Sequence, residues 1–389
     1  MSVLTLAWRY LAYYRTRTLL LVVALALTCV LPLSAHMLIR VFSERLLARA
    51  TATPLIVGPR GDRVNLVLKT LYFRSGDGGG VSEADVKSLQ DSGLALAIPM
   101  HLRYTAQGHP LVGTSLDYFD LRGLHTREGT LPRRLGDAVL GLHVAELLHL
   151  GPGDSLLTDQ QSLYDISSTY PLKLHVTGVL AHTGTADDEA VFVDVKTAWI
   201  VDGVSHGHTD VTAANADSSV ILERTDHEVK TNAAIVEYNE VTDANIASFH
   251  THGEDKDLPI SAVIVVPHDA KSATLLKARY GLSKTRQMLE PVAVVRELMD
   301  LVFRVQRFFD ANFALVATAA ALFLGLILVL SRQLRRRELE TMWRIGCRPG
   351  MTAQLQATEL TIVVVLSLLL AGGVALAALQ LAPQLVRLI

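Results

Sequence analysis

Three long apolar runs divide the chain, and the stretches between them alternate polar and apolar residues as soluble proteins do. The runs cover Leu19 to Val41, Asn312 to Leu330 and Leu360 to Ala382. The first contains no charged residue before Arg40, and the other two contain none. About 20 apolar residues in a helix span the hydrocarbon core of a bilayer. We therefore predict transmembrane helices over residues 19–41, 311–331 and 360–382.

Two other interpretations of these runs are weaker. A cleaved signal peptide has a shorter apolar segment followed by a small-x-small site, and the first run is longer and lacks a clean site. A helix buried in a soluble core usually keeps a polar face, which the second and third runs lack. The composition agrees with a membrane protein, because 50% of the 389 residues are hydrophobic.

The arginines near the helix ends predict the orientation. Three precede the first helix, and six lie between the second and third helices: Arg9, Arg15 and Arg17, then Arg332, Arg335, Arg336, Arg337, Arg344 and Arg348. Loops rich in Lys and Arg stay in the cytoplasm. Residues 42–310 would then lie outside, in the periplasm of a Gram-negative cell, and residues 383–389 would form a short outer tail. The chain would reside in the bacterial inner membrane.

The first 18 residues carry an amphipathic pattern. Leu4, Trp8, Leu11 and Tyr14 recur at helical spacing beside arginines. The pattern is typical of a helix lying on the inner membrane surface. An inward extension of the first membrane helix, with an aromatic belt, explains the pattern equally well.

The long stretch between the first and second membrane helices predicts an α+β domain. Short strands are indicated at LIVG from Leu55, AVLG from Ala138, LKLHVTGVL from Leu172 and ISAVIVVP from Ile260. A helix is predicted after Ser82, which is a favourable cap, and before Gly93. Residues 182–190 are expected to form a polar loop. We expect two subdomains. A helical pattern returns over residues 271–310, and the helix that includes LMDLVFRVQRFF is expected to continue into the second membrane helix as a stalk.

Four segments resemble one family of membrane proteins. They are LAWRYLAYYRTRTLLLVVALAL, VLGLHVAELLHLGPGDSLLT, LHVTGVLAHTGTADDEAVFVDVKTA and SRQLRRRELETMWRIGCRPGMTAQLQATE. In this order and with this topology, the chain resembles the permease subunits of FtsX/MacB/LolC-type ABC transporters, the mechanotransmission or type VII class. The resemblance implies a transmembrane bundle with a MacB-like α+β periplasmic domain inserted between the first and second membrane helices.

The resemblance also implies a function. Such a permease pairs with a separate cytoplasmic ABC ATPase, which holds the ATP and Mg²⁺, and with a second permease copy or a paralogue. ATP-driven motion would pass through the stalk to the periplasmic domain, which exports or extracts a substrate or acts on a periplasmic protein or lipoprotein. The alternative is an FtsX-like regulator that transmits the same motion to a periplasmic partner without transport. The family usually has four membrane helices, and a natural three-helix variant and a truncated end both fit the three predicted here.

The cytoplasmic segment from residue 332 to residue 359 is the candidate coupling site. Glu338, Thr341, Met342 and Ile345 share one helical face, and Gly346 is a favourable C-cap. By resemblance, this helix docks on the ATPase through six residues: Arg337, Glu338, Met342, Arg344, Ile345 and Gly346. The simpler explanation of its arginines is the positive-inside rule alone.

The sequence gives little support for catalysis or cofactor binding by this chain. No G-x-x-x-x-G-K-[ST] motif occurs, so ATP hydrolysis is expected in a partner chain and no cofactor in this one. No G-x-S-x-G or H-E-x-x-H motif occurs either, and the chain is not expected to be an enzyme. Nothing in the sequence indicates nucleic-acid binding.

The 14 histidines offer one other hypothesis. His206 and His208, with Asp202 and Asp210 nearby, and His250 and His252, with Glu254, are each a partial set of metal ligands. Solvated loop histidines are the plainer interpretation. The more specific hypothesis is that these histidines bind a metal and that the chain belongs to a metal-handling system.

Overall fold

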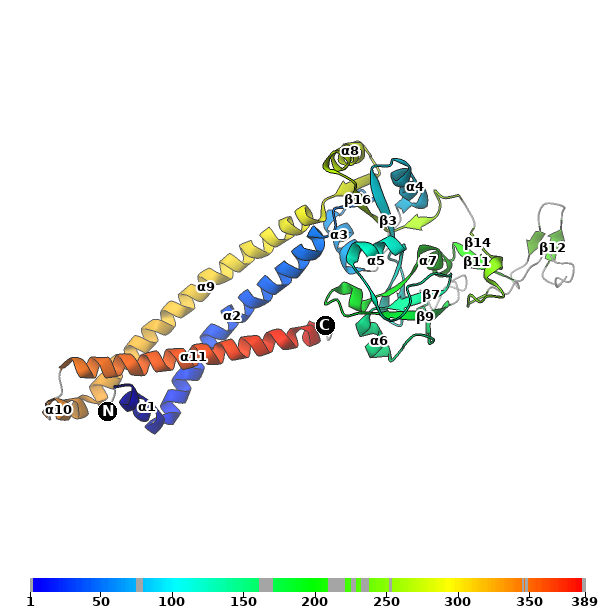
Figure 1. The fold of residues 1–389 in the computed structure, drawn as a ribbon. Helices are drawn as coiled ribbons and strands as arrows, with labels where there is room; N and C mark the ends of the chain where they lie inside the picture. Colours follow the sequence, from blue (N-terminus) through cyan, green and yellow to red (C-terminus); the bar gives the residue numbers. More distant parts are fainter. Residues whose placement is uncertain are drawn as a thin grey trace. The chain divides into compact units, whose positions relative to one another are not determined.

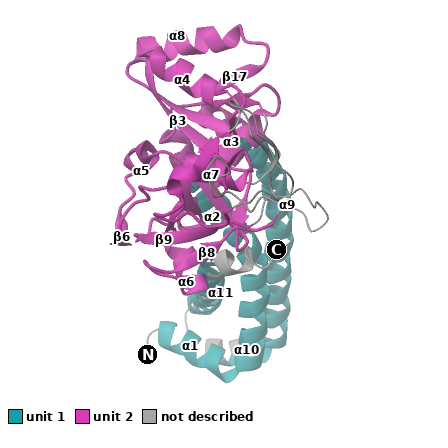
Figure 2. Cartoon of the chain, turned by 90° about the vertical axis from the view of Figure 1, so that its right-hand side faces the viewer, with its two compact units in different colours: residues 1–46, 298–389 teal, residues 47–297 magenta. Residues whose placement is uncertain are grey.

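The computed structural model describes residues 3–74, 80–160, 171–208, 221–224, 229–231, 238–251, 254–344, 346 and 349–386. The chain divides into two compact units, which Figure 2 shows in different colours. The helical unit comprises Met1–Leu46 and Leu298–Ile389, and the α/β unit comprises Leu47–Glu297. Each unit is described by itself.

The described part of the helical unit consists of helices, long ones and short ones (Figure 1). They are α1 (Val3–Tyr13), α2 (Arg15–Thr51), α9 (Pro291–Leu334), α10 (Arg336–Arg344) and α11 (Pro349–Val386), with the ends of α2 and α9 inside the α/β unit. Among the described residues, three helices are long and apolar enough to cross a membrane: α2, α9 and Gly350–Gln380 of α11. The prediction of three membrane helices is confirmed.

Two of these helices are much longer than one membrane crossing. Helix α2 has 37 residues and α9 has 44. At 1.5 Å per residue they measure about 55 and about 65 Å, against about 30 Å for the hydrocarbon core. Each therefore extends well beyond the lipid. The stalk expected before the second membrane helix is part of α9, which runs without a break from Pro291. The helical pattern expected from residue 271 is interrupted, because a separate helix ends at Gly281 and residues 286–289 form a strand.

The N-terminal segment is a separate helix. Helix α1 ends at Tyr13, α2 begins at Arg15, and α1 packs against α11. The Thr18 hydroxyl donates to the carbonyl of Leu11 across the junction, at 2.9 Å. The interpretation as the first turns of the membrane helix is therefore wrong. A position on the inner membrane surface stays a prediction.

The α/β unit consists of short strands and helices. In chain order they are β1 (Leu55–Pro59), α3 (Arg63–Tyr72), β2 (Val81–Ser82), α4 (Glu83–Asp91), β3 (Ala95–His101), β4 (Thr105–Ala106), β5 (His109–Thr114), α5 (Leu116–Arg122), β6 (Thr126–Gly129), β7 (Asp137–Leu140), α6 (Leu142–Leu148), β8 (Ser155–Leu157), β9 (Lys173–Leu180), the 3₁₀ helix η1 (Ala186–Glu189), β10 (Val191–Asp194), α7 (Val195–Val201), β11 (Ser205–Gly207), β12 (Ile221–Arg224), β13 (Val229–Thr231), η2 (Ile246–Ser248), β14 (Phe249–Thr251), β15 (Pro259–Ile260), β16 (Ala262–Pro267), α8 (Ala270–Gly281) and β17 (Arg286–Leu289).

One mixed sheet organises this unit. Within the described residues it has 11 strands, nine of them in the order β17-β1-β16-β3-β5-β10-β7-β9-β6. Strand β10 is parallel to β5, and β7 is parallel to β9, while β1, β16 and β3 pair antiparallel. Strand β16 is an inner, apolar strand, and its first four residues are fully buried. The expected α+β domain between the first and second membrane helices is confirmed.

Two expectations about this unit need correction. Separate hydrophobic clusters surround β7 to β10 and surround β1, β3 and β16, but one continuous sheet joins them, so the two subdomains are one unit. The expected polar loop over residues 182–190 contains η1, in which Asp187 and Asp188 are buried. Arg49 and Tyr118 bind the carboxylate of Asp187, and the backbone N–H groups of Thr183 and Gly184 donate to that of Asp188.

The predicted helix after Ser82 is confirmed. Helix α4 begins at Glu83, and the carboxylate of Asp85 accepts a hydrogen bond from the backbone N–H of Ser82 at 2.9 Å. This bond satisfies one of the donors left open at a helix N-terminus. Gly93 follows the helix with φ +62°, a conformation that glycine adopts without a steric penalty.

Candidate functional site

The end of α2 is anchored in the α/β unit by a buried arginine. The guanidinium of Arg49 forms two bonds to the carboxylate of Asp187, with Nη1–Oδ2 at 2.7 Å and Nη2–Oδ1 at 3.0 Å. The side chains are only 6% and 2% exposed. A two-pronged pair of this kind fixes the direction as well as the distance between the groups.

Two more elements join the same pair. The Tyr118 hydroxyl of α5 donates to Asp187 Oδ1 at 2.7 Å and accepts from Arg49 Nη2 at 3.0 Å. Arg49 Nε donates to the carbonyl of Leu71 in α3, and the Thr185 hydroxyl donates to Asp187 Oδ2 at 2.7 Å. We refer to Arg49, Asp187 and Tyr118 as the Arg49 clamp. It ties α2 to α3, α5 and η1.

The electrostatics of the clamp favour the charged pair. Burial alone raises the pKa of Asp187, but the hydrogen bond and charge of Arg49 outweigh it and hold that pKa below its usual value. Burial raises the pKa of Tyr118, so its hydroxyl keeps the proton that it donates. The aromatic rings of Phe73, Phe119 and Phe192 surround Tyr118 and exclude water from the site.

The last residues of the helix are fixed by a second contact. Arg122 of α5 donates to the hydroxyl of Thr53 at 2.8 Å, and this hydroxyl donates to the carbonyl of Arg49 at 3.0 Å. The end of α2 therefore cannot move without moving α5.

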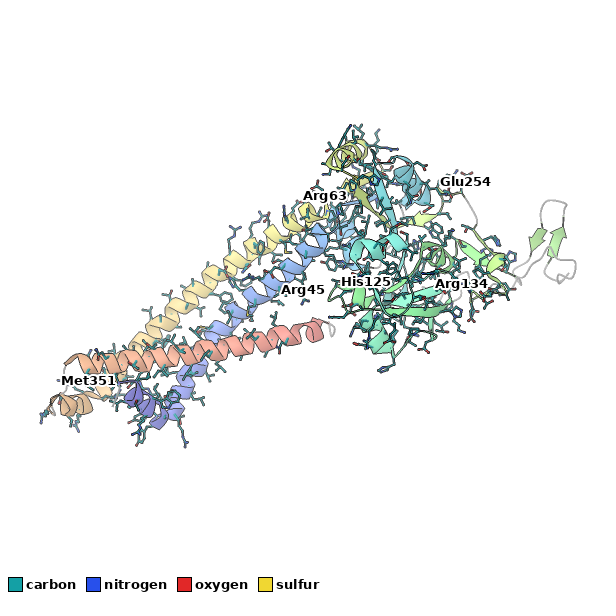
Figure 3. The ribbon with its side chains drawn as sticks, viewed as in Figure 1. Arg45, Arg63, His125, Arg134, Glu254 and Met351 are labelled. Carbon is teal, nitrogen blue, oxygen red and sulfur yellow. The ribbon has the colours of Figure 1, made fainter. Side chains whose placement is uncertain are left out.

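The chain leaves α2 and enters α9 through neighbouring strands. Strand β1 follows α2, β17 precedes α9, and the two pair antiparallel with Ile56 opposite Leu289. At the start of α9, Val294 and Val295 are buried. Glu297 lies 3.5 Å from Arg63, in the first turn of α3 (Figure 3). Both long helices thus connect to one edge of the sheet.

The predicted coupling helix is α10, between α9 and α11 in the sequence. Arg337 and Arg344 are exposed, and Gly346 has φ +95°, which glycine adopts readily at a helix C-terminus. The helix includes Glu338 and Met342, and Ile345 lies outside the described residues. No bound partner tests these six positions, so their role stays a prediction.

A second arginine–carboxylate–tyrosine set lies beside α10, at the junction of three helices. The guanidinium of Arg335 is 3.4 Å from both carboxylate oxygens of Glu359 in α11, and it stacks 3.8 Å above the ring of Tyr10 in α1. We refer to Arg335, Glu359 and Tyr10 as the inner-end cluster. It links α10 to α1 and α11 through the residue directly before α10.

The structure brings together three of the four predicted metal-binding histidines. Ligand atoms of His206, His208 and His250 all lie within 4.8 Å of one another. His252 and Asp210 lie outside the described residues. Asp202 instead accepts from Arg103 at 3.0 Å, and Glu254 pairs with Lys256 at 3.0 Å.

The Arg49 clamp was not predicted from the sequence. Its three residues come from the end of α2, from the segment that the sequence predicts to be a polar loop, and from the short helix α5. The available signals were an arginine just past a membrane helix and two adjacent aspartates before the aliphatic strand β10. Neither signal indicates that the two residues pair, because 138 residues separate Arg49 from Asp187 in the sequence.

Comparison with known proteins identifies the domain. The model of the MacB-like periplasmic core domain family matches residues 38–232. No curated protein matches the chain significantly.

Solved structures of low similarity are also found. The periplasmic region of MacB from Actinobacillus actinomycetemcomitans is 11% identical, with a TM-score of 0.36, over 63% of this chain and 92% of that one. The extracellular domain of the noncanonic ABC-type transporter YknZ from Gram-positive bacteria is 13% identical, with a TM-score of 0.33, over 61% and 99%. A domain of a putative permease from Porphyromonas gingivalis is 9% identical, with a TM-score of 0.27, over 61% and 86%.

Proposed function

Because the chain belongs to the FtsX/MacB-type ABC transporter permease family, through its MacB-like periplasmic core domain, we propose that it couples a cytoplasmic ATPase to motion of its α/β unit. The ATPase would be a separate chain that docks on α10. The α/β unit would act in the periplasm on a substrate that is exported or extracted there. The membrane permease would work as a dimer, with a second copy or a paralogue.

One observation carries the proposal: α9 is continuous between the α10 end and the β17 end. A rigid helix of about 65 Å transmits a displacement along its axis with little loss, since its backbone hydrogen bonds are all internal. At one end is α10, which is strongly amphipathic, and at the other is the sheet edge where β17 pairs with β1. By sequence spacing, Leu339, Met342 and Trp343 fall on one stripe of α10, as in helices that dock in grooves.

The Arg49 clamp supports the same role for α2. A pull on α2 would reach α3, α5 and η1 together, because Arg49 and Asp187 are bonded at 2.7 and 3.0 Å and are buried. We propose that the two long helices move the sheet edge in response to the ATPase.

The docking role of α10 is tested by co-purification from the native host. Met342→Glu places a charge on the apolar stripe, and we expect loss of the ATPase from the purified complex. Gln333→Glu adds the same charge at an exposed position at the end of α9, and its complex should survive. An intact complex with Met342→Glu would contradict docking through α10.

Transmission is tested separately from docking. The accessibility of the α/β unit to protease is compared in the purified complex without nucleotide and with ATP and vanadate. We expect a nucleotide-dependent difference in the wild-type complex. Arg49→Met should keep the ATPase bound but remove that difference, whereas Arg45→Met, one turn earlier at an exposed position of α2 (Figure 3), should preserve it. A nucleotide response that survives Arg49→Met would show that the clamp does not transmit the motion.

A further inference from the structure

Three histidines meet on one face of a small sheet in the α/β unit. Strands β11 and β14 pair antiparallel, with His206 opposite His250. His208 follows two residues after His206, and side chains two apart in an extended chain point to the same side. The ring centres of His250 lie 5.0 Å from both His206 and His208, which are 5.7 Å from each other.

The opposite face of this sheet holds the histidines in place. A Cβ atom at Gly207 would lie 2.7 Å from the ring of Phe249, so only glycine allows that ring to pack there. Phe249 packs against the hydrophobic cluster around β7 to β10. The hydroxyls of Ser205 and Thr251 are 2.7 Å apart across the strands. With this face turned to the core, the histidine face is turned outward.

A hydrogen bond determines the tautomer of one ring. His250 Nδ1 lies 2.9 Å from the carbonyl oxygen of Ser248. A carbonyl can only accept, so Nδ1 carries the hydrogen, and in the neutral ring Nε2 then has the lone pair. A backbone carbonyl in this position is the usual outer partner of a metal-bound histidine.

We propose that His206, His208 and His250 bind one divalent transition-metal ion, of the zinc, copper or nickel class. Three imidazoles suit these ions, whereas Mg²⁺ and Ca²⁺ prefer oxygen ligands. In a tetrahedral zinc site with Zn–N bonds of about 2.0 to 2.1 Å, the nitrogens are about 3.3 Å apart. The ligand atoms here lie within 4.8 Å, so small side-chain rotations complete the site.

The bound ion would connect distant parts of the chain. His208 and His250 are 42 residues apart in sequence, and an ion between them fixes the pairing of β11 with β14. This goes beyond the proposed coupling function, because ATPase docking on α10 involves none of these residues. A metal would therefore stabilise this part of the α/β unit whether or not the ATPase is bound.

The test is zinc binding to the full chain, purified in detergent through a tag without histidine. Isothermal titration calorimetry with ZnCl₂, after removal of metal by EDTA, should give one ion per chain, and MgCl₂ should give no signal at the same concentration. His206→Asn, His208→Asn and His250→Asn should each weaken zinc binding at least about tenfold, because each removes one ligand. The control is His125→Asn, an exposed histidine beside β6 (Figure 3), which should bind as the wild type does.

A spectroscopic measurement on the wild-type chain tests the site independently of how well the variants fold. Cobalt(II) bound to the wild type should show visible absorption bands, which zinc abolishes by displacement. The proposal is overturned if the wild-type chain binds no zinc, if all three cluster variants bind it with wild-type affinity, or if His125→Asn weakens binding as much as they do. In a Trp8→Phe, Trp343→Phe background, unchanged Trp199 fluorescence in a cluster variant would show that its lost affinity reflects a lost ligand and not an unfolded domain, since Trp199 is buried in the α/β unit.

Discussion

The Arg49 clamp and the inner-end cluster combine the same three kinds of side chain with different geometry. In the clamp, the arginine–carboxylate contacts are 2.7 and 3.0 Å, and the two side chains are 6% and 2% exposed. In the inner-end cluster, both contacts are 3.4 Å, and the exposures are 11% and 13%. Tyr118 forms hydrogen bonds with both charged partners, whereas Tyr10 contacts Arg335 through the face of its ring.

The difference indicates how firmly each set fixes its helices. Directed bonds below about 3 Å, with every oxygen occupied, allow one arrangement. Contacts at 3.4 Å and a ring face allow the arginine to shift without losing its partners. Under the proposed function, the clamp would be a rigid joint in the moving domain and the inner-end cluster an adjustable joint beside the ATPase-docking helix.

Loss of the clamp should have the largest effect. Arg49→Met leaves the buried carboxylate of Asp187 without its cation, which costs roughly 3 to 5 kcal/mol of unfolding free energy. We expect the melting temperature of the α/β unit to fall by roughly 10 °C. The measurement is Trp199 fluorescence in a Trp8→Phe, Trp343→Phe background, where Trp199 is the one tryptophan left of three.

Arg45→Met is the control for this change, because it removes the same charge from the same helix at an exposed position. Its melting temperature should stay within about 2 °C of the parent. Adding Asp187→Asn to Arg49→Met should recover part of the loss, since no unpaired charge remains. Equal effects of Arg45→Met and Arg49→Met would show that the clamp is not a special joint.

The second prediction concerns His101, where burial outweighs a nearby charge, the reverse of the balance at Asp187, whose pKa Arg49 lowers in spite of burial. His101 is 1% exposed, and Asp202 lies 3.5 Å from its Nε2. Burial lowers the pKa of His101 to about 4, against the opposing attraction of Asp202. The folded state therefore binds a proton less readily than the unfolded state, whose histidine has a pKa of about 6.5.

Stability from His101 is then fully present above about pH 6.5 and is lost as the pH falls towards about 4, by at most about 3 kcal/mol. His101→Gln should flatten this part of the pH profile of the Trp199 melting temperature. A variant with the wild-type slope between pH 6.5 and 4 would assign the acid sensitivity to other groups.

Loss of the inner-end cluster should have a smaller effect on stability than loss of the clamp. Arg335→Met removes contacts of 3.4 Å and a ring contact, and we expect a loss of about 1 to 2 kcal/mol in the docking of α1 on α11. Amide hydrogen exchange in α1 should then rise about 5- to 30-fold. Arg332→Met, at an exposed position three residues earlier, should leave this exchange unchanged. No increase with Arg335→Met would mean that α1 is held by other contacts.

The comparison also explains what could be predicted from the sequence. The apolar runs, the capped helix at Ser82 and the strand β16 follow from local periodicity, which needs no partner to be recognised. The Arg49 clamp depends on tertiary contact between residues 138 apart, so its aspartate looked like part of a solvated loop. Buried charge is rare, and local pattern alone assigns it to the surface.

The histidines are an intermediate case. Spacing in the sequence grouped His206 with His208 and His250 with His252, but it could not pair the two groups. The pairing depends on the register of β11 with β14, which places His206 opposite His250. Proximity in sequence also suggests Asp202 as a ligand, but it follows the end of α7 and its carboxylate accepts a hydrogen bond from Arg103. A shift of the register by one residue would turn His250 to the opposite face.

The smallest effect is expected at an ion pair that matches the clamp in distance but not in burial. Arg40 Nε lies 2.9 Å from Glu44 Oε1, one turn apart on α2, with side chains 81% and 63% exposed. Arg40→Ala should change the unfolding free energy by no more than about 0.5 kcal/mol, because water screens the pair and replaces its bonds. The same Trp199 melting curves measure it, with Glu44→Ala as the matched variant. If Arg40→Ala approached the effect of Arg49→Met, contact distance and not burial would distinguish rigid from adjustable joints. The contrast between the two clusters would then rest on the difference between 2.7 and 3.4 Å at their shortest arginine–carboxylate bonds.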